Sequence, residues 1–308
     1  MRVVFFGTPE FALPSLEALT RNHEVLAVCT QPDKPRGRKL MLTPSPVKEF
    51  ALSKGITVYE PRTLKKNDAF FETLKGLQAD VFVVAAYGHI LPGRFLCLPV
   101  HGSVNVHASL LPKYRGASPI HAALLFGDKT TGVTIMQMDT GLDTGDMILS
   151  VETEIAENDD FVGLHNRLAQ LGADALTDAL CQIGAGTAKR TPQDSSLSSY
   201  APTIKKSDGK INWEDGTGQI LNRIRAFSVW PGCFTMTDAG PLKINSGERF
   251  DTNSTVNPGM AIYANQNEGL VIKTGDGAIR VLELTPSGGK KMSPKDFLRG
   301  RREIKFIF

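Results

Sequence analysis

Short apolar runs alternate with longer amphipathic stretches along the first half of the chain. Runs rich in β-branched and aromatic residues predict buried strands at residues 3–6, 25–30, 56–59, 81–86 and 104–107. Apolar positions at helical spacing predict helices at residues 14–21, 46–54, 69–77 and 119–126. This alternation of strand and helix favours an open, mostly parallel α/β sheet.

Two more strands and a long helix complete the predicted first domain. The strands are expected at residues 132–138 and 147–151, joined by a loop rich in glycine and aspartate. An amphipathic helix is expected at residues 161–184, and we interpret its apolar stripe as core packing. The first domain is therefore predicted to cover residues 1–188.

The composition changes after Gly186. The next residues are rich in Ser, Thr, Pro and Lys and contain few large apolar side chains, which predicts an exposed linker at residues 189–207. Beyond it, glycine and proline separate short strand-like segments at residues 233–236, 270–273 and 279–284. This pattern favours a small all-β domain over residues 208–308 and leaves a barrel and a sandwich open.

Composition excludes several classes of protein. A length of 308 residues favours two domains, and 41% hydrophobic with 22% charged residues is typical of a folded globular chain. The longest apolar run, at residues 81–86, is far shorter than the roughly 20 residues that cross a bilayer. Residues 1–7 lack the apolar stretch and cleavage site of a signal peptide, so we expect a cytoplasmic enzyme without a membrane segment.

The cysteines and the net charge exclude few further classes of function. Cys29, Cys97, Cys181 and Cys233 are widely spaced and contain no C-x-x-C pair, so we expect reduced thiols and no metal site. The net charge of +3 does not by itself indicate a nucleic-acid partner. Any such partner must be inferred from where the charges lie.

The densest chemical signal lies at residues 104–116. Asn105 and His107 are two residues apart at the end of a predicted strand, so their side chains leave the same face of the sheet. Open α/β sheets bind ligands at this edge. An amide donor, an imidazole and the apolar segment that follows are suited to a flat heteroaromatic ligand.

The second signal is the aspartate- and glycine-rich loop at residues 139–146. A carboxylate from this loop would reach His107 and fix its tautomer, and we choose Asp143 among the three aspartates. Asn105, His107 and one aspartate suffice for acyl transfer to an amine. The amine is itself the nucleophile, and the protein stabilises the oxyanion and relays a proton.

These segments carry a resemblance to a known family. Residues 105–119 and 131–146 closely resemble the folate-dependent formyltransferases, and in particular the members that act on methionyl-tRNA. Further matches at residues 6–12, 30–33, 225–227 and 230–232 extend the resemblance over nearly the whole chain. It implies a Rossmann-like N-terminal domain and an OB-like C-terminal barrel. It also implies transfer of the formyl group of 10-formyltetrahydrofolate, the donor cosubstrate, to the α-amine of methionine on initiator tRNA, without a metal.

The resemblance also implies roles for particular residues. The family's catalytic asparagine, histidine and aspartate fall on Asn105, His107 and Asp143, which would bind the formyl oxygen, transfer the proton and orient the imidazole. The folate contact falls on Ser109, Leu110, Leu111 and Pro112. The pterin pocket is expected to be lined by Tyr87, Gly88, His89, Ile90 and Leu91.

Two basic clusters are candidates for tRNA phosphates. The first lies in a stretch that proline and glycine predict to be a loop, where five basic residues oppose Asp33: Lys34, Arg36, Arg38, Lys39 and Lys48. In the resembled family, an insertion here contacts the acceptor arm. The second cluster lies near the C-terminus and begins with Lys290 and Lys291. The linker lysines Lys205, Lys206 and Lys210 would supplement this second surface or only keep an exposed connector soluble, and an ordinary solvated loop is the alternative for the first cluster.

Three other functions remain open at this stage. A formyltransferase acting on an amino-sugar nucleotide would use the same three residues, although the first basic cluster argues against it. A formyltetrahydrofolate hydrolase, with water as acceptor, would be expected to have an additional N-terminal regulatory domain before Met1. A non-catalytic tRNA- or folate-binding module would keep the pocket without chemistry. The sequence indicates no obligate protein partner.

Overall fold

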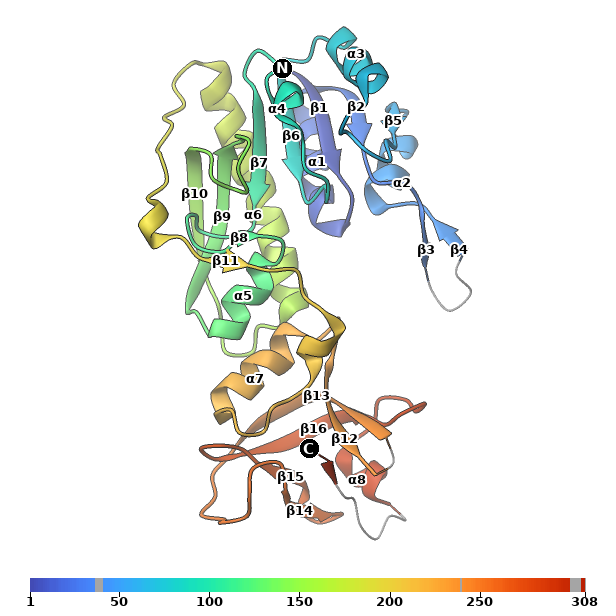
Figure 1. Ribbon diagram of the computed structural model, residues 1–308, viewed down its shortest axis with the longest axis vertical. Coiled ribbons are helices and arrows are strands. Elements are labelled where there is room, and N and C mark those ends of the chain that lie inside the picture. Colours follow the sequence, from blue (N-terminus) through green and yellow to red (C-terminus); the bar gives the residue numbers. More distant parts are fainter. Residues whose placement is uncertain (37–40, 239, 300–305, 308) are drawn as a thin grey trace. The chain divides into compact units, whose positions relative to one another are not determined.

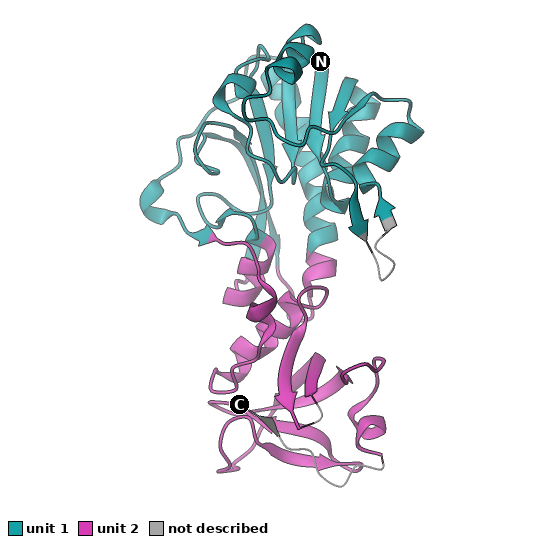
Figure 2. Cartoon of the chain, turned by 45° about the vertical axis from the view of Figure 1, so that its right-hand side comes forward, with its two compact units in different colours: residues 1–119, 130–154, 165–200 teal, residues 120–129, 155–164, 201–308 magenta. Residues whose placement is uncertain are grey.

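The computed structural model describes residues 1–36, 41–238, 240–299 and 306–307. The chain folds into two compact units (Figure 2). Unit 1 comprises residues 1–119, 130–154 and 165–200, and unit 2 comprises residues 120–129, 155–164 and 201–308. The sequence predicts two domains that follow one another along the chain. In the structure, two short segments of the predicted first domain, residues 120–129 and 155–164, pack with unit 2. The ring of His121 stacks 4.2 Å from that of Phe161 and lies 5.9 Å from that of Phe227.

A seven-stranded sheet organises unit 1, with strand order β10-β9-β7-β6-β1-β2-β5 (Figure 1). The strands from β7 to β5 pair in parallel, and β9 is antiparallel to both β7 and β10. The predicted mostly parallel, Rossmann-like sheet is therefore confirmed. Its strands are β1 (Arg2–Gly7), β2 (Glu24–Cys29), β5 (Val58–Tyr59), β6 (Val81–Ala85), β7 (Ser103–His107), β9 (Thr130–Gln137) and β10 (Met147–Glu154).

The helices of the first half lie where the apolar periodicity predicts them, except for a four-residue helix at Gly93–Leu96 that was not predicted. Serine and asparagine side chains cap two of them: Ser45 accepts the N–H of Lys48, and Asn67 accepts the N–H of Phe70. The helices are α1 (Leu13–Asn22), α2 (Pro46–Ser53), α3 (Asp68–Gly76), α4 (Gly93–Leu96), α5 (Pro119–Phe126) and α6 (Phe161–Gly184). None of the described helices is both long and apolar enough to span a membrane.

The loop predicted for the first basic cluster is wrong, because part of this stretch forms two short paired strands. Strands β3 (Lys34–Arg36) and β4 (Met41–Thr43) pair antiparallel over three residue pairs, so the segment is a hairpin. Strands of three residues are too short for a period-two pattern to identify, and the prolines suggested a turn instead.

Unit 2 contains a six-stranded sheet with order β14-β15-β16-β13-β12-β17, and each pair is antiparallel. This confirms the predicted C-terminal β domain, although the helices that accompany the sheet, α7 (Thr217–Ala226) and α8 (Pro294–Leu298), were not predicted. The strands are β12 (Cys233–Thr237), β13 (Gly240–Phe250), β14 (Ala261–Asn265), β15 (Gly269–Lys273), β16 (Ala278–Thr285) and β17 (Phe306–Ile307).

Asp276 fastens the start of α7 to the turn between β15 and β16. Its Oδ1 accepts the N–H of Thr217 at 2.7 Å and the hydroxyl of the same residue at 2.8 Å. The buried hydroxyls of Thr217 and Thr274 lie 2.7 Å apart. These hydrogen bonds lower the pKa of Asp276 below its ordinary value.

Candidate active site

The carboxyl ends of β1, β6 and β7 lie side by side at one edge of the unit 1 sheet. Asn105 and His107 leave the same face of β7, as their spacing predicts. His107 is 5% exposed and Asn105 is half-buried. Among the described residues, none hydrogen-bonds to the amide side chain of Asn105, so this donor is available to a ligand.

Both ring nitrogens of His107 face oxygen atoms. Nε2 lies 3.0 Å from the carbonyl oxygen of Tyr114, and Nδ1 lies 3.7 Å from Oδ2 of Asp143. A carbonyl oxygen only accepts, so Nε2 carries a proton and donates it to Tyr114. The tautomer is thereby set by a backbone group, and Nδ1 is the nitrogen that faces the carboxylate.

The Asp143 loop, residues 139–146, reaches His107 from an unexpected direction. Strand β9 runs antiparallel to β7 and ends opposite Val104, so the loop starts at the far end of β7 and folds back along it. Asp143 adopts a left-handed φ of 53° there, and its Oδ2 accepts the N–H of Gly116 at 2.8 Å. A Cβ on Gly145 would lie 1.8 Å from the carbonyl oxygen of Gln137, so only glycine allows the loop to close against β9.

The predicted folate segment, residues 109–112, is held by hydrogen bonds to β9. The hydroxyl of Thr134 donates to the Ser109 carbonyl at 2.8 Å and accepts the N–H of Leu111 at 3.1 Å. The Ser109 hydroxyl is itself buried and donates to the carbonyl of Lys113. Leu110 and Pro112 are half-buried and give this edge its apolar surface.

The predicted pterin segment, residues 87–91, divides into core and surface. Tyr87 and Leu91 belong to the hydrophobic core, and burial raises the pKa of the Tyr87 hydroxyl, which has no hydrogen-bond partner in the described chain. Gly88 and Ile90 are exposed and His89 is half-buried. The segment follows β6, so it lies at the same sheet edge as His107.

Two family models match the chain, and between them they cover most of it. A model described as formyl transferase matches residues 1–180, and one described as formyl transferase, C-terminal domain, matches residues 203–302. The chain belongs to the formyl transferase family. The predicted resemblance is confirmed over both units.

This formyl transferase is similar along nearly its full length to curated relatives. It is 46% identical over 301 residues to the methionyl-tRNA formyltransferase of Caldanaerobacter subterraneus subsp. tengcongensis, with 97% of each chain covered. It is 43% identical over 305 residues to that of Xanthomonas axonopodis pv. citri, with 99% of each chain covered.

Solved structures share the fold of this formyl transferase at lower identity. The N-formyltransferase of Helicobacter canadensis, in complex with folinic acid and dTDP-3-aminofucose, has a TM-score of 0.69 and 22% identity, with 94% of this chain and 99% of that chain covered. HypX of Aquifex aeolicus in complex with tetrahydrofolic acid has a TM-score of 0.64 and 17% identity, with 97% and 47% covered.

The predicted tRNA-binding residues differ in their exposure and in their contacts, and two of them lie outside the described residues. Lys34 is exposed on β3, where its ammonium contacts Oε1 of Gln31. Arg36 ends the same strand, and Arg38 and Lys39 lie outside the described residues. Near the C-terminus, exposed Lys290 precedes Lys291, which forms an ion pair with Glu283 at 2.6 Å.

Lys48, which the sequence pattern placed in the first basic cluster, belongs to a different structure. Its ammonium lies 2.9 Å from both carboxylate oxygens of Asp33 and 2.8 Å from Oε2 of Glu60. The side chain is 18% exposed, and these hydrogen bonds raise the pKa of Lys48. Oε1 of Glu60 is buried without a partner in the described chain. Lys48 therefore joins the base of the hairpin to the end of β5 rather than facing solvent.

Sequence reasoning missed several groups around His107. The backbone groups of Tyr114 and Gly116 lie within the recognised motif, but nothing in the motif shows that they bind His107 and Asp143. Gln193 was assigned to the exposed linker, yet its amide contacts the Asp143 loop. A long-range contact of this kind has no periodic signal in the sequence.

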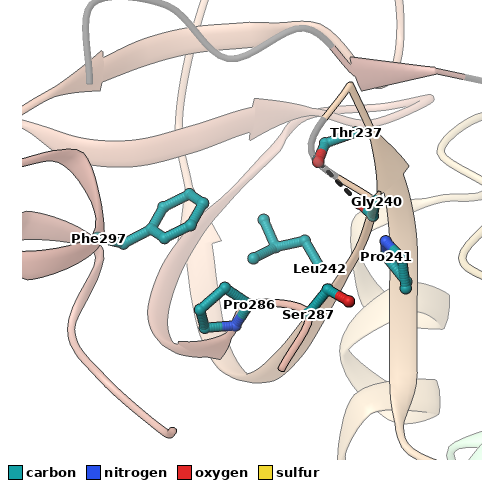
Figure 3. A pocket seen from close by; sticks show the side chains of 7 residues that line it. All are labelled: Thr237, Gly240, Pro241, Leu242, Pro286, Ser287 and Phe297. Atoms are coloured by element: carbon teal, nitrogen blue, oxygen red, sulfur yellow. Dashed lines mark hydrogen bonds between the residues drawn. The ribbon is translucent and has the colours of Figure 1, made fainter. Parts of the chain in front are cut away.

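A small cavity lies in unit 2 and is lined by residues between Thr237 and Phe297 (Figure 3). Its volume is about 40 Å³, and it lies beside the turn that joins β12 to β13, where the Thr237 hydroxyl donates to the Gly240 carbonyl. Sites for drug-sized ligands typically occupy about 300–1,000 Å³. The described residues that line it are apolar side chains, a glycine and the hydroxyl residues Thr237 and Ser287.

Proposed function

We propose that this chain transfers the formyl group of 10-formyltetrahydrofolate to the α-amine of initiator methionyl-tRNA. The observation that carries the proposal is the pairing of His107 with Asp143 beside the Asn105 amide, which has no hydrogen-bond partner among the residues that the structure describes. Sequence identity of 46% to a methionyl-tRNA formyltransferase over 97% of the chain supports the choice of acceptor. Folate complexes of proteins that share the fold support the donor.

The residues at this edge supply what direct acyl transfer needs. The amine nitrogen bonds to the formyl carbon, the bond from that carbon to the donor nitrogen breaks, and the proton lost by the amine passes to the donor nitrogen. Asn105 donates to the formyl oxygen as negative charge develops on it. His107 relays the proton at Nδ1, because Nε2 is held by the Tyr114 carbonyl. Asp143 orients the imidazole ring of His107, and its carboxylate faces the ring while the ring carries the extra proton.

The acceptor is held by charge. The β3–β4 hairpin is basic, and Lys48 is already neutralised by two carboxylates, so Lys34, Arg36, Arg38 and Lys39 are the cations left for phosphates. Lys290 and Lys291 are proposed as a second phosphate-binding surface on unit 2. Phosphate contacts of this kind position the tRNA without reading its sequence.

The decisive experiment offers two acceptors to one donor. Purified protein is mixed with 10-formyltetrahydrofolate and charged initiator methionyl-tRNA, with an amino-sugar nucleotide tested in parallel, and formyl transfer to each amine is measured. We expect formylated methionyl-tRNA. Transfer only to the sugar would overturn the acceptor and the two basic surfaces. No transfer to either, with folate and tRNA still bound, would indicate a non-catalytic module.

A further inference from the structure

His107 is held by two groups that are themselves held by one segment. The connector, residues 189–200, follows α6 and was predicted to be an exposed linker. Every side chain in it is exposed except Gln193, which is half-buried. The connector pairs with β10, where the backbone N–H groups of Thr191 and Met147 each donate to the other residue's carbonyl oxygen at 2.9 Å.

Gln193 binds the Asp143 loop with one end of its amide and Arg115 with the other. Nε2 donates to the carbonyl oxygens of Asp143 at 2.9 Å and Gly145 at 2.8 Å. Oε1 accepts from Nε and Nη2 of Arg115 at 3.0 and 2.8 Å. The whole hydrogen-bonding capacity of this amide is used between two segments that flank His107.

Ser199 makes the corresponding contact on the other side of His107. Its Oγ accepts the N–H of Tyr114 at 2.9 Å, and its carbonyl accepts the N–H of Arg115 at 2.9 Å. Tyr114 adopts a φ of 60° and Asp143 a φ of 53°, a left-handed conformation that non-glycine residues rarely adopt. Both His107 partners therefore occupy backbone conformations that need external hydrogen bonds, and the connector supplies one to each.

We infer that Gln193 and Ser199 are positioning residues, which place the Asp143 carboxylate and the Tyr114 carbonyl on the two ring nitrogens of His107. Their catalytic role rests on the proposed function. Neither residue touches a reacting group, so they act through Asp143 and Tyr114. Displacement of a catalytic group by about 1 Å costs up to about a hundredfold in rate, which sets the scale of the expected effect.

Gln193→Glu is the sharpest variant. It keeps the shape of the side chain and the acceptor for Arg115, but it removes both N–H donors to the Asp143 loop. We expect kcat to fall about tenfold to a hundredfold while KM for the folate donor stays within about twofold. Ser199→Ala removes only the hydroxyl that accepts the Tyr114 N–H and should reduce kcat in the same direction.

Two matched controls make the same substitutions at residues that contact neither the Asp143 loop nor Tyr114. Gln170→Glu changes an exposed glutamine of α6 whose amide donates to Asp174. Ser198→Ala changes the neighbour of Ser199, and the hydroxyl of Ser198 donates to the carbonyl of Ser195. Both should keep wild-type kcat. In an Asp143→Asn background, Gln193→Glu should cost several-fold less than in the wild type, because the residue through which it acts is already altered.

Amide exchange provides a readout that does not depend on activity. The N–H of Gly116 donates to Asp143 Oδ2, so Gln193→Glu should accelerate its exchange without lowering the melting temperature. If the wild type transfers no formyl group, the proposed function fails and exchange alone decides the positioning role. Unchanged exchange in Gln193→Glu, or equal costs of this variant in wild-type and Asp143→Asn backgrounds, would overturn the inference.

Discussion

Nδ1 of His107 and Oδ2 of Asp143 lie 3.7 Å apart, which is beyond the usual hydrogen-bond range. Oδ2 is meanwhile bound to the N–H of Gly116 at 2.8 Å. The carboxylate is thus fixed by the backbone rather than by the imidazole. Because Nε2 donates to the Tyr114 carbonyl, Nδ1 is the less constrained nitrogen, and its lone pair accepts a proton and passes it on with the smaller rearrangement.

His107→Ala should reduce kcat by about 10²–10⁴, the usual contribution of a positioned acid–base group. Asp143→Asn should reduce it less, since the amide oxygen still accepts the Gly116 N–H. Both variants should bind tetrahydrofolate and melt as the wild type does. Steady-state kinetics with calorimetric folate binding tests this, and weaker binding with unchanged kcat at saturating donor would contradict the assignment.

Lys48→Met should destabilise the protein by about 1–3 kcal/mol, because two partly buried carboxylates lose their counter-charge. It should also raise KM for methionyl-tRNA and leave KM for the donor unchanged, since the hairpin is anchored there. Urea unfolding and kinetics measure the two effects. Adding Glu60→Gln should restore part of the stability, and a further loss in the double variant would refute the ion-pair explanation.

Arg38→Ala should weaken tRNA binding and reduce the slope of log K against log salt concentration by about 0.9 for each phosphate that the arginine no longer neutralises. Donor affinity should not change. Filter binding over a range of salt concentrations checks this, with Arg21→Ala on α1 as the control, because that arginine belongs to neither basic cluster. Salt-independent weakening would count against a phosphate contact.

Asp276→Asn should make the free energy of unfolding fall less steeply as the pH is lowered. The pKa of Asp276 is lower in the folded chain than its ordinary value, so its contribution is present above the unfolded pKa of about 4 and disappears as pH falls through the folded pKa. The variant should therefore be less stable at pH 7 and lose less of its stability between about pH 5 and pH 2. Urea unfolding at several pH values measures this, and an unchanged acid slope would exclude the role.

The amino-acid sequence alone determined most of the first unit and part of the site. Helix positions agreed within one residue at α1, α2 and α3, because apolar spacing and capping residues act locally. Asn105 and His107 were placed on one face by the period of a single strand. In unit 2, α7 was not predicted, because it has few apolar residues and is held by a tertiary contact to Asp276.

Only the tertiary structure decided what surrounds His107. Asp143 was a chemical choice among three aspartates, and its approach depends on a loop that folds back along β7. The charge pattern alone predicts that Lys48 faces phosphate, whereas two carboxylates bind it, and the composition around Gln193 predicts a linker, whereas its amide binds the Asp143 loop. Each of these contacts joins side chains that are distant in sequence. Local propensity and periodicity carry no information about such pairs, which form only when the sheet brings its loops together.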